Sequence, residues 1–269
     1  MGKEQLNLFD YVFKQGLWVL SLFDGISCGM VALERAGIPV ERYVAYEIEP
    51  NAIKISKKNY PQIEHCGDVT KADFAQYEGF DLVIAGSPCQ GFSIAGGHLN
   101  FKDPRSKLYF EFERALKEVK PKFFLLENVR MRQEWSNTIT DRLGVQGVTI
   151  NSEVLSAQSR NRTYWTNIEF ETPIVDRGIS LQSILEFGET KREKSKTVRV
   201  GGSGSGWGDK HEWDMPNESR IYTTIELERL QTLPDNYTNG VSESQRRKCI
   251  GNGWTVDVIA HILKGIKEK

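Results

Sequence analysis

The sequence predicts an α/β fold with a doubly wound, mostly parallel β-sheet. The first observation is an alternation of short apolar runs with helical patterns along the first half of the chain. The second is that several of these runs are nearly continuous, as is typical of strands buried on both faces of a parallel sheet. The third is a length of 269 residues with 39% hydrophobic and 26% charged residues, which suits one α/β domain with a real core.

The expected elements begin with a short amphipathic helix over residues 3–15. The run LWVLSLF at 17–23 predicts a strand that ends in the turn DGISCG. The helical pattern GMVALERAG follows and ends at Gly37, because glycine commonly terminates helices. YVAYEIE at 43–49 predicts the second strand, and Pro50 then opens the helix PNAIKISKKNY, since proline is well tolerated in a first helical turn.

The alternation continues beyond this helix. IEHCGDV predicts a short strand with a turn, and FDLVIAG and KFFLLENV predict two further strands that flank the helix SKLYFEFERALKEV. VTINSEVLSA and RTYWTNIEF predict a closing pair of strands. Strands that alternate with helices in this way favour a parallel sheet covered by helices.

The character of the sequence changes near residue 169. Residues 170–220 combine the charged stretch TKREKSK with the run VGGSGSGWGDKHEW, which is typical of a flexible linker or a surface loop. Helical patterns return at TTIELERLQTLP and TVDVIAHILKGIKEK. We therefore expect a main domain formed by residues 1–169 and 221–269, with a small insertion at 170–220.

Charge and cysteine content narrow the class of protein. The formal net charge is −1, so the basic excess common in nucleic-acid binders is missing, although acidic residues elsewhere can balance a basic groove. The N-terminus lacks the apolar segment of a secretion signal, and no apolar run approaches the about 18 residues needed to span a bilayer. Cys28, Cys66, Cys89 and Cys249 form no CxxC pair and no zinc pattern. We expect a soluble cytoplasmic protein with free thiols and no metal or membrane partner.

Five short motifs fall at the ends of predicted strands. FDGISCG follows the first strand, Glu47 ends the second, GDV follows the third, SPCQ follows the fourth and ENV ends the fifth. Ligands of an open α/β sheet bind outside the carboxyl ends of its strands. The motifs therefore predict a single site on this edge.

The first three motifs favour an adenosine ligand that carries a positive charge. FDGISCG is not a GxGxxG pattern, and it places Asp24 where a phosphate would be repelled. Glu47 comes 22 residues after Gly25, near the interval at which an acidic residue meets ribose hydroxyls, and Asp68 suits the amine of an adenine. S-Adenosylmethionine, with its sulfonium centre, has this chemistry. The alternative is that Asp24 caps the following helix and Glu47 is a solvated strand end.

The motif AGSPCQGFS places a thiol in a glycine-rich turn. Cys89 follows a proline at the edge of the sheet, which suits a nucleophile, whereas a buried structural cysteine is inert. Cys28, Cys66 and Cys249 fit the inert class better. None of the four histidines lies in a recognisable partner motif, so a cysteine hydrolase is weakly supported.

Glu127 ends the apolar run FFLLE, where a carboxylate is costly unless it has a partner or a task. Beside a thiol it suits a cytosine ring, whose N3 and amino group it would hold while the thiolate attacks C6 and makes C5 nucleophilic. Arg160 and Arg162 in AQSRNR suit the charge that develops, or they belong to a solvated loop.

Together these motifs resemble those of the DNA (cytosine-5) methyltransferases, in the order of that family and through nearly the whole chain. Several stretches look closest to the mammalian de novo enzymes, whereas the compact chain looks more like a bacterial or phage enzyme. The motifs that carry the resemblance are SLFDGISCG, AYEIEP, GDVT, GSPCQGFS, ENV, AQSRNRTYW, ERLQTLPD and GNGWTVDVI.

The resemblance implies a Rossmann-like S-adenosylmethionine-dependent methyltransferase fold with a small target-recognition insertion. It also implies methyl transfer from S-adenosyl-L-methionine to C5 of a flipped-out cytosine in double-stranded DNA, through a covalent bond between Cys89 and C6. S-Adenosyl-L-homocysteine is the product, and no metal is needed. Glu127 would contact N3 and N4, Arg160 and Arg162 would steady the base, and residues 91–107 would close over it.

The resemblance also implies cofactor and DNA contacts. The positions that match cofactor contacts of the family are Phe23, Asp24, Gly25, Ile26, Glu47, Ile48, Asp68, Val69, Pro88, Leu108, Asn252, Gly253 and Trp254. The candidate DNA contacts are Gln90, Ser93, Lys196, Arg199 and Lys210. The last three suit phosphates better than base edges. No counterpart of the guanine-reading arginine of the mammalian CpG enzymes is found, so the target sequence stays open, as do the oligomeric state and any accompanying restriction enzyme.

Three alternatives remain beside this interpretation. A tRNA cytosine-5 methyltransferase of the same fold would share the Pro-Cys and ENV motifs, but its characteristic Cys-Phe-Thr tripeptide is absent here. A catalytically inactive regulatory homologue would commonly lack the nucleophile or the glutamate, and this chain has both Cys89 and Glu127. Nothing in the cofactor motifs demands a modified donor. The expected setting is the cytoplasm of a bacterial or phage-infected cell, in association with the nucleoid.

Overall fold

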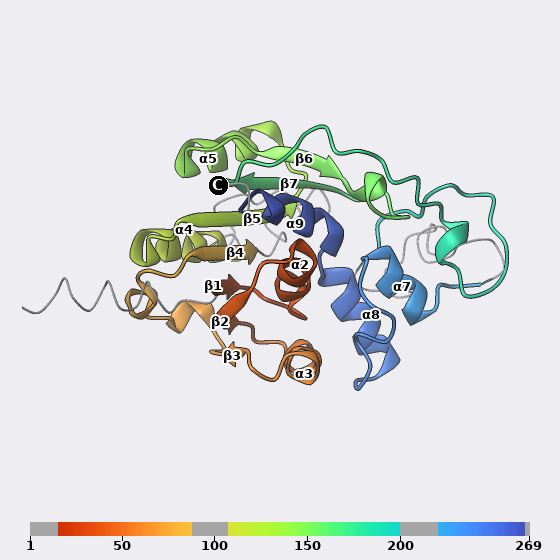
Figure 1. The fold of residues 1–269 in the computed structure, drawn as a ribbon, viewed down its shortest axis with the longest axis horizontal. Helices are drawn as coiled ribbons and strands as arrows, with labels where there is room; N and C mark the ends of the chain where they lie inside the picture. Colours follow the sequence, from red (N-terminus) through yellow and green to blue (C-terminus); the bar gives the residue numbers. More distant parts are fainter. Residues whose placement is uncertain (1–15, 88–106, 200–219, 267–269) are drawn as a thin grey trace, which may run out of the picture.

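The protein is built around one seven-stranded sheet (Figure 1). The structure, a computed structural model, describes residues 16–87, 107–199 and 220–266. The strand order is β3-β2-β1-β4-β5-β7-β6. The first five strands pair in parallel, whereas β7 is antiparallel to both β5 and β6. The predicted doubly wound, mostly parallel sheet with a closing pair of strands is thereby confirmed.

The elements have the following bounds. The strands are β1 (Leu17–Leu22), β2 (Val40–Tyr46), β3 (Glu64–His65), β4 (Leu82–Gly86), β5 (Phe123–Val129), β6 (Val148–Asn151) and β7 (Asn161–Thr166). The α-helices are α2 (Cys28–Ala36), α3 (Pro50–Asn59), α4 (Lys107–Val119), α5 (Gln133–Leu143), α7 (Thr224–Leu230), α8 (Glu243–Asn252) and α9 (Val256–Leu263). Short 3₁₀ helices are η1 (Val69–Lys71), η2 (Phe74–Tyr77), η6 (Ser152–Val154), η7 (Gln182–Ile184) and η8 (Lys264–Ile266).

The structure differs from the predicted elements at a few places. The strand expected at 43–49 starts at Val40 and ends at Tyr46, because Glu47 turns away to accept main-chain hydrogen bonds. Helices α5 and α8 were not expected: α5 carries several β-branched and turn-favouring residues, and α8 buries only three residues near its end. The helix expected at 3–15 lies outside the described residues.

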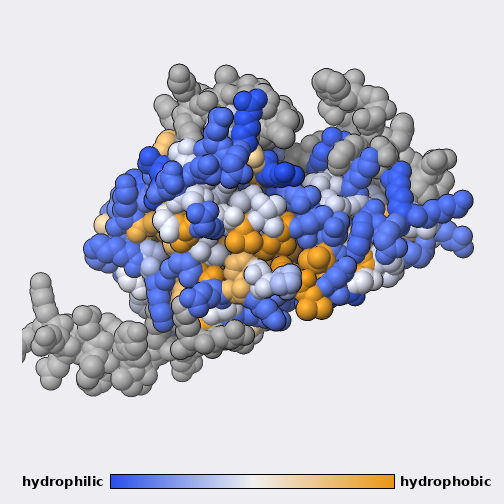
Figure 2. Space-filling model, turned by 90° about the horizontal axis from the view of Figure 1, so that it is seen from above, coloured by the Kyte–Doolittle hydropathy of each residue, from blue (hydrophilic) through white to orange (hydrophobic). Residues whose placement is uncertain are grey.

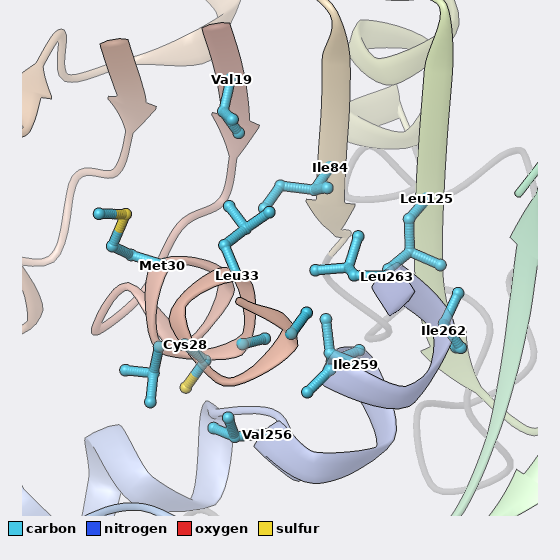
Figure 3. Packing of buried hydrophobic residues seen from close by; sticks show 14 of the residues in the cluster. Val19, Cys28, Met30, Leu33, Ile84, Leu125, Val256, Ile259, Ile262 and Leu263 are labelled. Carbon is cyan, nitrogen blue, oxygen red and sulfur yellow. The ribbon is translucent and has the colours of Figure 1, made fainter. Parts of the chain in front are cut away.

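Successive residues of the central strands face opposite layers of helices. Val19, Ile84 and Leu125 pack against α2 and α9 on one face (Figure 3). Their neighbours along the strands join a second cluster with α4, α5 and η2 on the other face. Burying one such side chain contributes about 1.5–3 kcal/mol, so the two clusters fix the sheet and, with it, the edge where the strands end.

A third apolar cluster connects the region after residue 170 to α7 and α8. Leu181 and Val198 pack there with Tyr222, Leu230 and Ile250. The cluster therefore takes residues from both sides of the expected boundary at residue 220. Residues 200–219 lie outside the described residues, and the division into domains stays a prediction.

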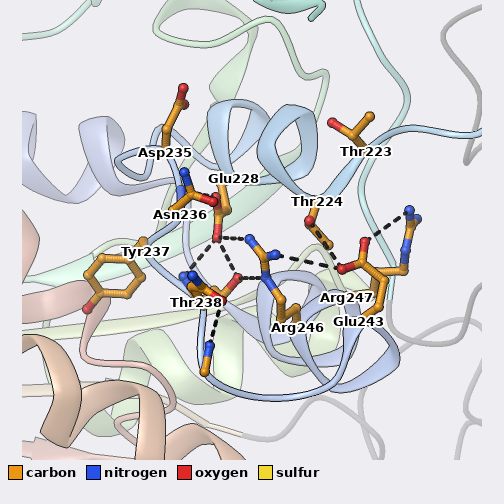
Figure 4. A network of polar contacts seen from close by, with 12 residues as sticks. Thr223, Thr224, Glu228, Asp235, Asn236, Tyr237, Thr238, Glu243, Arg246 and Arg247 are labelled. Atoms are coloured by element: carbon orange, nitrogen blue, oxygen red, sulfur yellow. Dashed lines mark hydrogen bonds and ion pairs between the residues drawn. The ribbon is translucent and has the colours of Figure 1, made fainter.

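A buried glutamate joins α7 to α8. Glu228 is fully buried and accepts hydrogen bonds from the main-chain N–H groups of Asn236 and Thr238, at 2.7 and 2.8 Å (Figure 4). Nη2 of Arg246 lies 3.1 Å from the same carboxylate. A buried carboxylate is tolerated when its charge is paired and its oxygens are bonded, so this network holds the turn between the two helices.

Hydrophilic side chains cover most of the face seen in Figure 2, and apolar atoms gather near its middle. The described large apolar side chains that are most exposed are Ile48, Val175, Phe187 and Ile221. Among these, Ile48 follows the end of a strand. None of the helices described reaches the length and apolarity that a bilayer crossing requires.

Candidate active site

The carboxyl ends of β1, β2, β4 and β5 bring most of the predicted motifs to one edge. Glu127 lies within β5, where it is the register partner of Gly86, the last residue of β4. On its other side it faces Tyr164 of β7. The glutamate is thus set into the sheet by strands on both sides, which fixes its main chain.

Cys89 lies outside the described residues, as do Pro88, Gln90, Ser93 and nearly all of the predicted closing loop at 91–107. The described chain reaches Ser87, whose Oγ accepts a hydrogen bond of 2.8 Å from Nδ2 of Asn128. Asn128 is 1% exposed and follows Glu127 in β5. The segment that leads to Cys89 is therefore anchored beside the strand that carries the glutamate.

Both carboxylate oxygens of Glu127 have partners. Oε1 lies 3.0 Å from Nε of Arg162, and Oε2 accepts a hydrogen bond of 3.1 Å from the indole Nε1 of Trp254. Glu127 is 8% exposed. Two predicted site residues, Glu127 and Arg162, are brought together here, and Trp254 joins them from the segment before α9.

Arg160 takes a different direction. It is 5% exposed, and its guanidinium donates to the carbonyl oxygens of Val198 and Gly253, at 2.9 and 3.1 Å. A third hydrogen bond of 3.4 Å goes to the carbonyl of Gly251. Arg160 thus supports the main chain on which Trp254 is mounted, and a direct role at the base stays a prediction.

Two buried glutamines complete this support. Nε2 of Gln231 donates to the carbonyls of Ile250 and Gly253, each at 3.0 Å, and its Oε1 accepts from Gln158 and Thr255. Both glutamines are fully buried. Sequence reasoning missed the supporting role of Gln158 and Gln231, although they stand in the motifs AQSRNR and ERLQTLPD. For Gln231 the available signal was its place within an apolar pattern, because a buried amide needs hydrogen-bond partners.

The loop between β1 and α2 is unusually strained. Phe23, Gly25 and Ser27 all have positive φ, at 58°, 60° and 60°. This region suits glycine but costs about 1–3 kcal/mol for other residues, and such strain often clusters at functional sites. The surrounding structure must therefore hold the loop in place.

Asp24 contributes much of the hydrogen bonding that keeps this loop in place. It is 8% exposed and accepts hydrogen bonds from the hydroxyls of Ser21, Ser27 and Tyr43, at 2.6, 2.5 and 2.7 Å. Burial raises the pKa of Asp24, and the three hydroxyls oppose that shift. Ser27, not Asp24, is the N-cap residue of α2, so the alternative of a simple helix cap is wrong. A direct contact of Asp24 with a cofactor stays a prediction.

Glu47, directly after β2, binds the same loop. Oε2 accepts from the N–H of Gly25 at 2.8 Å, and Oε1 accepts from the N–H groups of Ile48 and Glu49, both at 2.8 Å. The alternative of a solvated strand end is therefore wrong. Ile48 itself is 71% exposed, so a large apolar side chain stands free beside this carboxylate.

The remaining predicted cofactor positions lie on several segments. Asp68 accepts from the N–H and the hydroxyl of Thr70, and these bonds lower the pKa of Asp68. Val69 and Gly253 are buried, Leu108 is half-buried on α4, and Asn252 is exposed at the end of α8. Ile26 is 1% exposed and belongs to the core.

Two turns at this edge leave their main chain open to a ligand. Gly25 and Gly67 have positive φ, and no described atom lies within 4 Å of the place that a Cβ would take at either glycine. A ligand can therefore approach the main chain closely at both turns. A carboxylate stands at each turn, because Glu47 binds the N–H of Gly25 and Asp68 follows Gly67.

The described cysteines fall into two groups. Cys28 and Cys249 are buried, and burial raises their pKa values to about 12 and about 11, so both thiols are inert as predicted. Cys66 is exposed, with Sγ 3.6 Å from the hydroxyl of Tyr77. The expectation of a buried Cys66 is wrong, because it follows the two-residue edge strand β3 and not a central one.

The candidate DNA contacts are only partly described. Lys196 is half-buried and Arg199 is exposed, and they flank Val198, whose carbonyl binds Arg160. Lys210 lies outside the described residues. Arg130 and Arg132, which sequence reasoning did not consider, are exposed directly after β5. No group of three or more His, Cys, Asp or Glu side chains suited to a metal occurs among the described residues.

The sheet order and the site at its edge define a Rossmann-like S-adenosylmethionine-dependent methyltransferase fold. The family model for C-5 cytosine-specific DNA methylases matches residues 17–198 and 132–268. The chain belongs to this family, which confirms the resemblance seen in its motifs.

Related sequences agree with this assignment. The type II methyltransferase M.NgoBV of Neisseria gonorrhoeae is 34% identical over 203 residues, which span 65% of this chain and 47% of that protein. The chain thus spans about half the length of that relative. M.NlaX of Neisseria lactamica, also a type II methyltransferase, is 29% identical over 300 residues, with 93% and 96% covered.

Among solved structures, the Dnmt2 methyltransferase of S. pombe has a TM-score of 0.73 at 20% identity, over 94% of this chain and 98% of that one. The methyltransferase EhMeth of Entamoeba histolytica has a TM-score of 0.76 at 17% identity, over 95% and 99%. At these identities the likeness shows the fold.

Proposed function

We propose that this chain transfers a methyl group from S-adenosyl-L-methionine to C5 of a flipped-out cytosine in double-stranded DNA, through a covalent bond between Cys89 and C6. The observation that supports this most is the carboxylate of Glu127, 8% exposed, held between Arg162 and Trp254. It stands beside the strand whose continuation carries Cys89. A buried, oriented carboxylate next to a thiol suits a polar, electron-poor ring.

The chain's own residues divide the chemistry. Glu127 accepts a hydrogen bond from the amino group of cytosine and shares a proton with N3, which draws electrons from the ring. The thiolate of Cys89 adds to C6, and the electron pair of the C5–C6 double bond then attacks the methyl group. A water molecule takes the C5 proton, and the electron pair of that C–H bond restores the double bond and expels the thiolate. Arg162 stabilises negative charge on the base oxygen.

The donor, when bound, supplies a methyl group on a positively charged sulfur that is already activated for transfer. Glu47 and Asp68 would hold its ribose and adenine, and the strained turn at Phe23 and Gly25 would lie against it. The acidic surroundings match a cation and disfavour a phosphate. The product of the transfer is S-adenosyl-L-homocysteine.

Glu127 is too deeply set to reach a base inside a duplex, which is why the cytosine must leave the stack. We propose residues 170–220 as the target-recognition region and residues 1–169 with 221–269 as the catalytic domain. Lys196, Arg199 and Arg130 would contact phosphates around the flipped base. The protein would act on DNA in the cytoplasm of a bacterial or phage-infected cell, in association with the nucleoid.

The test uses duplex DNA that carries 5-fluorocytosine in mixed sequence contexts, with S-adenosylmethionine. Fluorine at C5 prevents the final elimination, so the enzyme should remain covalently attached. The expected result is a denaturant-resistant adduct that is lost in Cys89→Ala, with cofactor binding retained. Sequencing the trapped DNA then gives the target site.

Two outcomes would overturn the proposal. An adduct on fluorocytosine-containing tRNA but not on DNA would assign the reaction to RNA. No adduct on either, by a folded protein that binds the cofactor, would favour a catalytically inactive regulatory role.

A further inference from the structure

We propose that Trp254 is a positioning residue whose indole N–H orients the carboxylate of Glu127 for the base. The proposal rests on the proposed function, since the orientation matters only if Glu127 binds cytosine. Sequence reasoning assigned Trp254 to the cofactor. In the structure its indole N–H donates to the glutamate, with Nε1 3.1 Å from Oε2, and a cofactor contact of the ring stays a prediction.

The first argument concerns the carboxylate. Nε of Arg162 forms an ion pair with Oε1 at 3.0 Å, whereas the indole of Trp254 donates a hydrogen bond to Oε2, so Trp254 supplies the directional contact. An indole is a donor only, and it cannot exchange this role for an acceptor's. The hydrogen bond at Oε2 sets the direction of the carboxylate, the ion pair draws Oε1 toward Arg162, and each oxygen retains a lone pair for the base.

The second argument concerns the space that the ring occupies. A Cβ at Gly86 would lie 2.7 Å from Nε1 of Trp254, and a Cβ at Gly29 would lie 3.5 Å from its Cζ3. The ring therefore lies directly on the main chain of β4, at the residue that pairs with Glu127. Glycine at position 86 is required because any side chain there would displace the indole nitrogen.

The third argument concerns the main chain of Trp254. The carbonyl of Gly253 accepts from Arg160 and Gln231, at 3.1 and 3.0 Å. The hydroxyl of Thr255 donates to Gln231 at 2.9 Å. The residues on either side of Trp254 are thus fixed by buried groups, and the indole is aimed before any substrate arrives. Such preorganisation is what an oriented catalytic group needs.

The test measures single-turnover adduct formation on 5-fluorocytosine DNA at saturating cofactor. Trp254→Phe removes the N–H, together with the indole atoms that face Gly86. We expect the rate of adduct formation to fall about 10- to 100-fold, because one hydrogen bond to a charged group is lost. The affinity for S-adenosylmethionine should change less than about threefold. The matched control is Trp165→Phe, because Nε1 of Trp165 makes a bond of 3.1 Å to Thr140 away from the site. That control should keep the wild-type rate.

Coupling to Glu127 separates positioning from a general structural effect. In a Glu127→Ala background, Trp254→Phe should cause no further loss of rate, because the group that it orients is gone. Equal fold-losses in both backgrounds, or a wild-type rate in Trp254→Phe, would overturn the inference. If Trp254→Phe does not fold, Gly86→Ala displaces the same indole and must show the same dependence on Glu127. If the wild-type protein forms no adduct, it is the proposed function that fails.

Discussion

The buried pair of Arg162 and Glu127 makes Arg162→Ala a severe test of how the site is held. The two side chains are 16% and 11% exposed. Removing the guanidinium leaves a carboxylate that water barely reaches, with Trp254 as its remaining partner at 3.1 Å. Breaking a buried pair in this way costs about 3–5 kcal/mol, and the retained hydrogen bond favours the lower end of that range. We expect the free energy of unfolding to fall by about 3 kcal/mol.

The assay is reversible urea unfolding, supported by thermal melts, in which about 3 kcal/mol corresponds to a fall in Tm of about 6–12 °C for a chain of this size. The double variant Arg162→Ala/Glu127→Gln should recover most of the loss, because it buries an amide and not a charge. Arg42→Ala is the control, since it breaks a pair with Glu64 whose side chains are 37% and 48% exposed and should cost under about 1 kcal/mol. A loss in Arg162→Ala no larger than in Arg42→Ala, or no recovery in the double variant, would refute the reasoning.

Three further perturbations test other parts of the molecule. Gln231→Ala removes four hydrogen bonds within the buried support of Gly253 and should lower the free energy of unfolding by about 2–4 kcal/mol in urea. Arg130→Ala should make the slope of log K for DNA binding against log salt shallower by about 0.9. Lys57→Ala, at an exposed position on α3, is the control and should leave this slope unchanged. Equal slopes for the two variants would exclude a phosphate contact of Arg130. Burial raises the pKa of Cys28 from 9.0 to about 12, so stability that is fully present below pH 9 should be lost as the pH rises toward 12. Wild type should lose about 4 kcal/mol more than Cys28→Ala across that interval, and parallel pH curves would contradict this.

The sheet could be predicted because its strands are nearly continuous apolar runs. LWVLSL and FFLLE are buried on both faces, so their pattern carries through to the structure without help from neighbours. Glu127 could be singled out for the same reason, since a carboxylate at the end of such a run needs a partner. Helix α8 could not, because only Cys249, Ile250 and Gly251 are buried and the other positions are polar on every side.

The contact between Trp254 and Glu127 lay beyond the sequence. The two residues are 127 positions apart, and what brings them together is the packing of α9 beside α2 and the bare main chain at Gly86. No local pattern encodes that geometry. The exposure of Cys66 could not be predicted for a related reason. Over only two residues, the sequence of a short edge strand does not differ recognisably from that of a buried strand.

The buried hydrogen bonds around Arg160 connect two tasks that the sequence separates. Its guanidinium holds the carbonyl of Val198, between the candidate DNA contacts Lys196 and Arg199, and the carbonyl of Gly253, next to Trp254. Gln158 spans the same gap, because it accepts from the N–H of Val198 and donates to Gln231. A shift of the main chain at residue 198 is therefore resisted by the same groups that aim the indole at Glu127. A short chain of hydrogen bonds thus connects the segment expected to meet DNA, through the residue before Trp254, with the carboxylate expected to meet the base.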